Sequence, residues 1–210
     1  MTQISPSAAV YGVVLNDSAS LQALGDLEAA PYKAPPRAPV LYIKPANTHS
    51  QDMRLPPGAT EVEVGATIGL VLGRDATRLS ATEALAALAG VVPAADLSLP
   101  HSSYYRPAIR EKCFDGALRL GAVQPLSDLS RVALSVEIDG KVADGWPLAS
   151  LIRDPARLLA EVTAFMTLRA GDVLLVGVRY KAPRAPAGSC VRVVASGMPA
   201  LEFEIAKEQS

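Results

Sequence analysis

The stretch from residue 132 to residue 140 constrains the fold of this chain more than any other stretch of the sequence. Its apolar residues recur at every second position, which places them on one face of a strand. They are Val132, Leu134, Val136 and Ile138. Asp139-Gly140 follows directly, and this pair is typical of a two-residue turn between antiparallel strands. The stretch therefore predicts a β-hairpin.

Further strands are predicted along the whole chain, because short runs rich in Val, Ile and Leu are bounded by Gly, Pro, Asn and Asp. They fall at residues 11–15, 40–43, 61–72, 173–176, 191–194 and 201–205. We expect residues 61–72 to hold one or two strands, and residues 40–43 to form a buried strand closed by Lys44-Pro45. The proline-rich connector at residues 31–39 is predicted to be neither a helix interior nor a central strand.

Three short helices are expected. The first covers residues 18–27. The second follows a capping box at residues 80–83, in which a serine and a glutamate satisfy each other's backbone amides, and it is expected to end at Gly90. The third begins at Asp154-Pro155, with Asp as the cap and Pro in the first turn. Its apolar face is formed by Leu158, Leu159, Val162, Phe165 and Met166.

Many strands and few helices predict a β-rich α+β fold rather than a doubly wound sheet. With 210 residues, the chain is long enough for one domain with a real core and short for two. We expect a small strand-and-helix segment at residues 1–30 and a core at residues 31–210, which together form one structural domain.

Charge and cysteine content exclude several classes of protein. The chain has 20 basic and 21 acidic residues without clusters, so nothing in its charge favours binding to nucleic acid or to an anionic membrane. Cys113 and Cys190 lie far apart and have neither a redox nor a zinc spacing, which indicates reduced thiols. No signal peptide or membrane-spanning run is recognised. These features predict a cytoplasmic protein.

Common catalytic motifs are absent: we find no nucleophile elbow, no phosphate-binding glycine loop and no dinucleotide fingerprint. His49 and His101 are the only histidines, too few for a histidine-rich metal site. Glu61 and Glu63 would share one face of a strand, as ligands of Mg²⁺ could. The interpretation that we favour is a solvated strand edge with two outward carboxylates.

Several stretches, taken in order, resemble the fumarylacetoacetate hydrolase family. They are residues 42–45, 71–74, 89–96, 112–116 and 165–172. The likeness covers nearly the whole chain. It implies the mixed β-sandwich roll of that family, with a few short helices, and a dimer or larger assembly.

A narrower resemblance rests on residues 31–36, 96–100 and 104–109. These stretches are similar to the N-terminal half of a two-domain decarboxylase/isomerase of homoprotocatechuate (4-hydroxyphenylacetate) breakdown. The substrate there, 5-oxopent-3-ene-1,2,5-tricarboxylate, loses CO₂ before its double bond is moved. The resemblance implies that the present chain is that half encoded as a separate subunit, acting on this or a related 2-oxo diacid.

The family uses Mg²⁺ or Mn²⁺ to chelate a 2-oxo acid and stabilise an enolate. Its Glu-x-Glu ligand pair, counted back from Gly73, falls on Gly65 and Thr67, and its third ligand falls on Asp96. A single Asp supplies too little negative charge to offset the cost of removing water from Mg²⁺. A shift of four residues that brought in Glu61 and Glu63 would move them about 13 Å along a strand, so we reject it. We expect no tightly bound cofactor, unless a partner subunit supplies the metal.

The resemblance implies catalytic roles for Lys112 and Asp96 and a substrate-binding role for Lys44. For Lys112, an ordinary surface salt bridge is an equal alternative. Three further residues are expected to line a pocket for a polycarboxylate, although core packing is the favoured alternative for the two tyrosines. These residues are Tyr104, Tyr105 and Arg106.

Three hypotheses remain open for the function. The first is a decarboxylase-type enzyme subunit that works without its own metal or with a metal from a partner. The second is a catalytically silent subunit that pairs with a metal-bearing paralogue. The third, and weakest, is an independent Mg²⁺-dependent hydrolase that uses Glu61 and Glu63.

Overall fold

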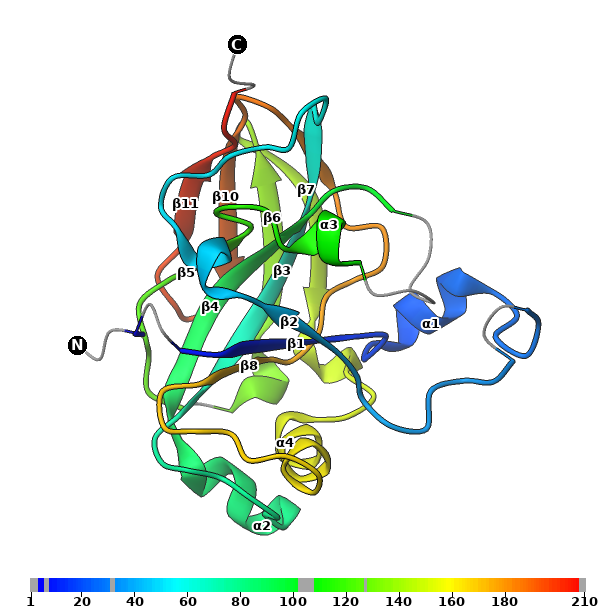
Figure 1. Cartoon of the computed structure of the whole chain (residues 1–210), viewed down its shortest axis with the longest axis vertical. Helices are drawn as coiled ribbons and strands as arrows, with labels where there is room; N and C mark the ends of the chain where they lie inside the picture. The colour runs from blue at the N-terminus through cyan, green and yellow to red at the C-terminus, as the bar shows by residue number, and fades with distance from the viewer. Residues whose placement is uncertain (1–3, 6–7, 31–32, 102–107, 127, 208–210) are drawn as a thin grey trace.

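The computed structural model describes residues 4–5, 8–30, 33–101, 108–126 and 128–207. Two β-sheets dominate it, and the few helices are short (Figure 1). This confirms the predicted β-rich α+β class. Within the described residues, no helix has the length and apolar character that crossing a membrane requires.

The larger sheet has seven strands in the order β2-β1-β8-β3-β4-β5, with β9 paired to β3. Among the strands that the structure describes, only β1 and β8 pair in parallel, so the sheet is mixed. Its strands are β1 (Val10–Val14), β2 (Val40–Lys44), β3 (Glu61–Leu72), β4 (Leu88–Ser98), β5 (Leu118–Leu120), β8 (Val173–Leu175) and β9 (Arg184–Pro186).

The smaller sheet has four antiparallel strands in the order β11-β10-β6-β7. Its strands are β6 (Ala133–Ile138), β7 (Lys141–Pro147), β10 (Cys190–Ala195) and β11 (Leu201–Glu204). The predicted hairpin is confirmed, because β6 and β7 pair around Asp139 and Gly140, both with positive φ (49° and 77°). Positive φ at both positions is what a type I′ turn requires.

The main core lies between the two sheets. Apolar side chains from both sheets belong to one buried cluster, which includes Val64 and Ile68 of β3, Val136 of β6 and Val193 of β10. Burial of these aliphatic side chains is the dominant stabilising contribution. The layers are those of the expected β-sandwich roll.

The helices are α1 (Ser18–Leu24), α2 (Ala81–Ala84), α3 (Ile109–Lys112) and α4 (Pro155–Thr163). Single 3₁₀ turns add η1 (Ala46–His49), η2 (Leu85–Ala87), η3 (Leu129–Arg131) and η4 (Leu148–Ser150). The predicted caps of two helices are confirmed. The capping box of α2 is complete, and the Asp154 carboxylate accepts a hydrogen bond from the Arg157 amide at the start of α4.

Three predicted helix details are wrong. The second helix does not reach Gly90, because residues 88–90 pair with the end of β3 and belong to β4. The first helix ends at Leu24 rather than at residue 27, since Gly25 takes a positive φ there. Phe165 lies beyond the end of α4 and is 66% exposed, so it is not part of the packed face.

Strand β2 is also not the buried apolar strand that was predicted. It is the edge strand of the larger sheet, and Ile43 is 52% exposed. Its buried residue is instead Lys44, only 1% exposed. In Figure 1, β2 passes in front of the strands that carry the candidate site described next.

Candidate functional site

Asp96 lies near the end of β4 and is 1% exposed. Its cross-strand partner is Gly65 of β3, and residues directly opposite each other in an antiparallel pair project from the same face. A buried carboxylate needs partners that replace its lost water. Its neighbours therefore define the chemistry of this site.

Two lysine ammonium groups bind Asp96. Lys44 Nζ of β2 lies 2.6 Å from Oδ1, and Lys112 Nζ of α3 lies 2.7 Å from Oδ2. Both lysines are buried. The structure thus brings together three of the residues that the sequence singled out, from an edge strand, a central strand and a one-turn helix.

Tyr42 completes the cluster. Its hydroxyl donates a hydrogen bond to Oδ2 of Asp96, and its ring centroid lies 4.5 Å from Lys112 Nζ, a cation–π contact. Gly12 of β1 is paired with Tyr42, and a Cβ at position 12 would lie 2.0 Å from the tyrosine ring. A residue without a side chain is therefore needed at position 12 to leave room for this ring.

Lys44 has further oxygen neighbours. Its ammonium donates to the backbone carbonyls of Leu97 at 2.8 Å, Lys112 at 2.6 Å and Ala117 at 3.0 Å, besides contacting Asp96. These partners lie on three different segments around the site. Lys44 therefore fixes β4, α3 and the start of β5 relative to β2.

The cluster holds more positive than negative charge. Burial by itself would raise the pKa of Asp96, but the ammonium groups of Lys112 and Lys44 outweigh burial and hold it at about 2. Burial lowers the pKa of Lys44 to about 8, although the Asp96 carboxylate counteracts it. At pH 7, two ammonium groups and one carboxylate leave a net charge of +1.

These residues do not fit a divalent metal ion. A Cβ at Gly65 would lie 2.9 Å from Val178 Cγ1 and 3.0 Å from the Asp96 carbonyl oxygen, so the place of the first family ligand is filled by Val178. Thr67 offers one neutral hydroxyl, and both carboxylate oxygens of Asp96 already contact lysines. Among the described residues, no three His, Cys, Asp or Glu side chains are grouped as metal ligands.

The two glutamates of β3 differ from each other. Glu61 is partly exposed and pairs with Arg184 Nη1 of β9 at 2.8 Å, as a strand-edge carboxylate should. Glu63 is only 6% exposed, and Arg184 Nε lies 3.9 Å from its carboxylate. The interpretation of two outward, solvated carboxylates is therefore wrong for Glu63.

Ser98 and His101 lie beside Glu63. Ser98 is the cross-strand partner of Glu63, and its hydroxyl lies 3.3 Å from His101 Nδ1. Burial raises the pKa of Glu63, while the charges of His101, Arg184 and Lys112 partly offset that rise. Glu63 thus belongs to the same electrostatic environment as Lys112.

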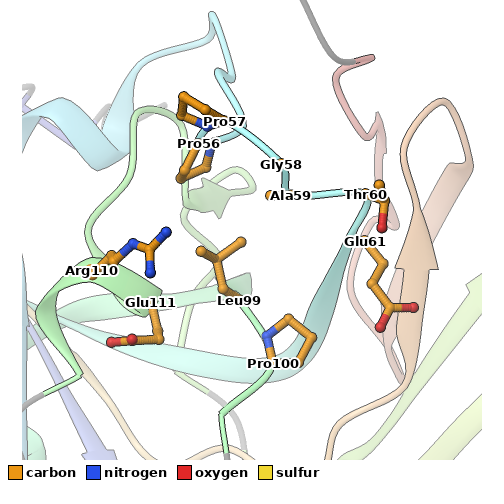
Figure 2. A pocket seen from close by; sticks show the side chains of 10 residues that line it. All are labelled: Pro56, Pro57, Gly58, Ala59, Thr60, Glu61, Leu99, Pro100, Arg110 and Glu111. Carbon is orange, nitrogen blue, oxygen red and sulfur yellow. The ribbon is translucent and has the colours of Figure 1, made fainter.

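A pocket of about 280 Å³ opens where β4 ends and β3 begins. Figure 2 shows Arg110 and Glu111 of α3 on one side, residues 56–61 around the other, and Leu99 between them. Pro100 also lines it. Three residues that were expected to line a pocket fall outside the described part of the chain, namely Tyr104, Tyr105 and Arg106.

Comparisons with known proteins agree with this fold. Residues 9–206 match the family model described as fumarylacetoacetate (FAA) hydrolase C-terminal. The chain belongs to the fumarylacetoacetate hydrolase family. The expected family is therefore confirmed over nearly the whole chain.

Two curated relatives of this family member cover most of the chain. The 4-hydroxyphenylacetate degradation bifunctional isomerase/decarboxylase of Salmonella dublin is 39% identical over 203 residues, which are 95% of this chain and 47% of that protein. The homoprotocatechuate catabolism bifunctional isomerase/decarboxylase of Escherichia coli is 36% identical over 95% of this chain and 48% of its own length. The chain thus spans about half of these relatives. Its correspondence to their N-terminal half stays a prediction.

A solved structure supports the fold of this family member. Fumarylpyruvate hydrolase from Pseudomonas aeruginosa, in complex with Mn²⁺ and pyruvate, superposes with a TM-score of 0.81 at 20% identity. The match covers 99% of this chain and 93% of that one. At this identity the match supports the fold alone, and the Mn²⁺ and pyruvate are features of that relative.

Sequence reasoning missed the parts that Tyr42 and Glu63 play. The sequence held an indication that Tyr42 lies beside Lys44, because residues 42 and 44 share one face of a strand. The glycine at position 12 leaves room for the tyrosine ring. The burial of Glu63 had no local signal, since it depends on β9 and on the segment that follows β4.

Proposed function

We propose that this chain is a cytoplasmic decarboxylase-type subunit that acts on 5-oxopent-3-ene-1,2,5-tricarboxylate or a related 2-oxo diacid, as a homo-oligomer or together with a paralogous subunit. The names of its curated relatives support the reaction class. The observation that carries the proposal is the buried cluster of Lys44, Asp96 and Lys112. Its net positive charge suits an anionic substrate whose reaction develops further negative charge on an oxygen.

In this reaction the bond to the departing carboxylate breaks, and its electron pair moves through the conjugated system to the 2-oxo oxygen. Lys112 is the residue we assign to that oxygen, because its ammonium can stabilise the dienolate more than the ketone. The Asp96 carboxylate and the Tyr42 ring hold the ammonium in place. Asp96 is therefore a positioning residue in this proposal.

Lys44 receives a positioning role as well. Its ammonium contacts Asp96 and three backbone carbonyls, so its donors are already engaged within the chain. A substrate would have to displace one of these buried partners to bind it. Lys44 is thus a positioning residue in this proposal, in place of the substrate-binding residue that the resemblance implied.

Lys112→Met tests the proposal. Removing a preorganised cation from a developing oxyanion is expected to lower kcat for CO₂ release by about 100- to 1,000-fold. The matched control is Lys141→Met, an exposed lysine of the β6–β7 hairpin, which should keep the wild-type rate. An unchanged kcat in a folded Lys112→Met protein would remove Lys112 from the reaction.

A second candidate is a catalytically silent subunit. It is favoured by the closed cluster, in which both oxygens of Asp96 have partners from this chain, and by the match to only half of the relatives' length. Assay of the chain alone and mixed with a metal-bearing paralogue separates the two candidates. Activity found only in the mixture and insensitive to Lys112→Met would establish the silent subunit.

A further inference from the structure

We propose that Glu63 is the acid that delivers a proton to carbon when the dienolate left by CO₂ loss becomes the keto product, so that this chain also catalyses the isomerising step. The inference rests on the proposed function and deepens it. The proton donor of this second reaction would be a residue that occupies none of the family's metal-binding positions.

The strand register places Glu63 beside the lysine cluster. Glu63 and Gly65 project from the same face of β3, and their partners on β4 are Ser98 and Asp96. Two residues along an antiparallel strand span about 7 Å. A substrate with its 2-oxo oxygen at Lys112 and its conjugated chain directed along β3 would bring that chain beside Glu63.

The surroundings of Glu63 are suited to holding a proton. The residue is 6% exposed, and Arg184 cannot neutralise it fully, because Nη1 of that arginine lies 2.8 Å from Glu61 while its Nε is 3.9 Å from Glu63. Burial raises the pKa of Glu63 and so favours the protonated acid. The charged groups that act on it are His101, Arg184, Lys112 and Glu61.

The step balances without a further reactant. The dienolate carries the electron pair left by CO₂, spread from the 2-oxo oxygen to the far carbon of the diene. The O–H bond of Glu63 breaks, a C–H bond forms at that carbon, and the π electrons shift to restore the C=O group. The Glu63 carboxylate then takes a proton from water.

The experiment supplies the 2-hydroxydiene diacid directly, whose hydroxyl proton is lost to water to give the dienolate, so that ketonisation is measured without prior decarboxylation. Ultraviolet absorbance follows the loss of the conjugated diene, and NMR in D₂O follows deuterium at the new C–H position. For Glu63→Gln we expect ketonisation to fall by about 100-fold or more, as for other general acids. CO₂ release from the tricarboxylate should stay within about threefold of wild type, because this step does not use the Glu63 proton.

Glu204→Gln is the control, since Glu204 is an exposed glutamate at the end of β11 in the smaller sheet. It should ketonise the diene at the wild-type rate. Wild-type ketonisation should also fall as pH rises through the raised pKa of Glu63, and the remaining rate of Glu63→Gln should lack this decline.

Three outcomes would overturn the inference: a wild-type protein that does not exceed the spontaneous rate, a Glu63→Gln protein that ketonises normally, or equal loss of both activities in a variant with an unchanged melting temperature. Failure of the proposed function appears differently. In that case the wild type releases no CO₂ from the tricarboxylate, yet Glu63→Gln still abolishes ketonisation of the supplied diene.

Discussion

Two ion clusters in this molecule have opposite arrangements of charge. In the larger sheet, the anion Asp96 lies between the cations Lys44 and Lys112. In the smaller sheet, the cation Arg192 of β10 lies between Glu137 of β6 at 2.9 Å and Glu202 of β11 at 3.1 Å. The distances are similar, but the first cluster is buried, whereas the side chains of the second are 25% to 69% exposed.

This difference shows that burial, rather than pairing, decides what a cluster contributes. Water screens Arg192 and solvates whatever partner it loses, so its ion pairs add little stability. Asp96 has no water to replace a lost lysine, and each member of that cluster depends on the others. The buried cluster can therefore hold an ammonium at a fixed place, which catalysis needs and the exposed cluster does not offer.

Asp96→Asn should have the largest effect on stability. It leaves two buried ammonium groups without their carboxylate, and loss of one partner of a buried ion pair costs about 3–5 kcal/mol. Urea denaturation followed by circular dichroism measures the free energy of unfolding. A decrease of less than about 1 kcal/mol in the free energy of unfolding would mean that water enters the Asp96 cluster. The buried cluster would then contribute no more to stability than the exposed ion pairs of Arg192.

Lowering the pH should have an intermediate effect on stability, because it protonates the Asp96 carboxylate. The pKa of Asp96 is about 2 in the folded chain against 3.8 ordinarily, so the folded state favours its ionised form. This stabilisation is fully present above pH 3.8 and is lost as pH falls through about 2. The free-energy gap between wild type and Asp96→Asn should narrow by about 2 kcal/mol between pH 5 and pH 2. A gap that stays constant with pH would contradict this assignment.

Arg192→Gln should have the smallest effect. Glu137 and Glu202 remain solvated when the guanidinium is removed, so we expect the melting temperature to stay within about 2 °C of wild type. Raising the salt concentration should reduce even this difference. A shift as large as that of Asp96→Asn would show that exposed cross-strand ion pairs stabilise this sheet more than burial predicts.

Local signals predicted the parts of the fold that depend on a few neighbouring residues. The Asp139-Gly140 turn and the caps at Ser80 and Asp154 were recognised because their chemistry is complete within four residues. Strand β4 was missed, since the alanine-rich residues before Pro93 resemble a helix locally. Its pairing with β3 overrides that preference.

The candidate site was predicted as a set of residues but not as an arrangement. The family resemblance singled out Asp96, Lys112 and Lys44, and the structure places them in contact. Their separate roles depend on how the edge strand β2 reaches β4 and on which carbonyls surround Lys44, neither of which is encoded in a local pattern. The catalytic roles themselves stay predictions.

The side chain of Val178 limits which side chains position 65 can accept. A glutamate at position 65 would meet that valine and a carboxylate already held by two ammonium groups. A single substitution there would cause a clash before it added a ligand for a cation. A carboxylate ligand at position 65 therefore requires a smaller residue at position 178 as well.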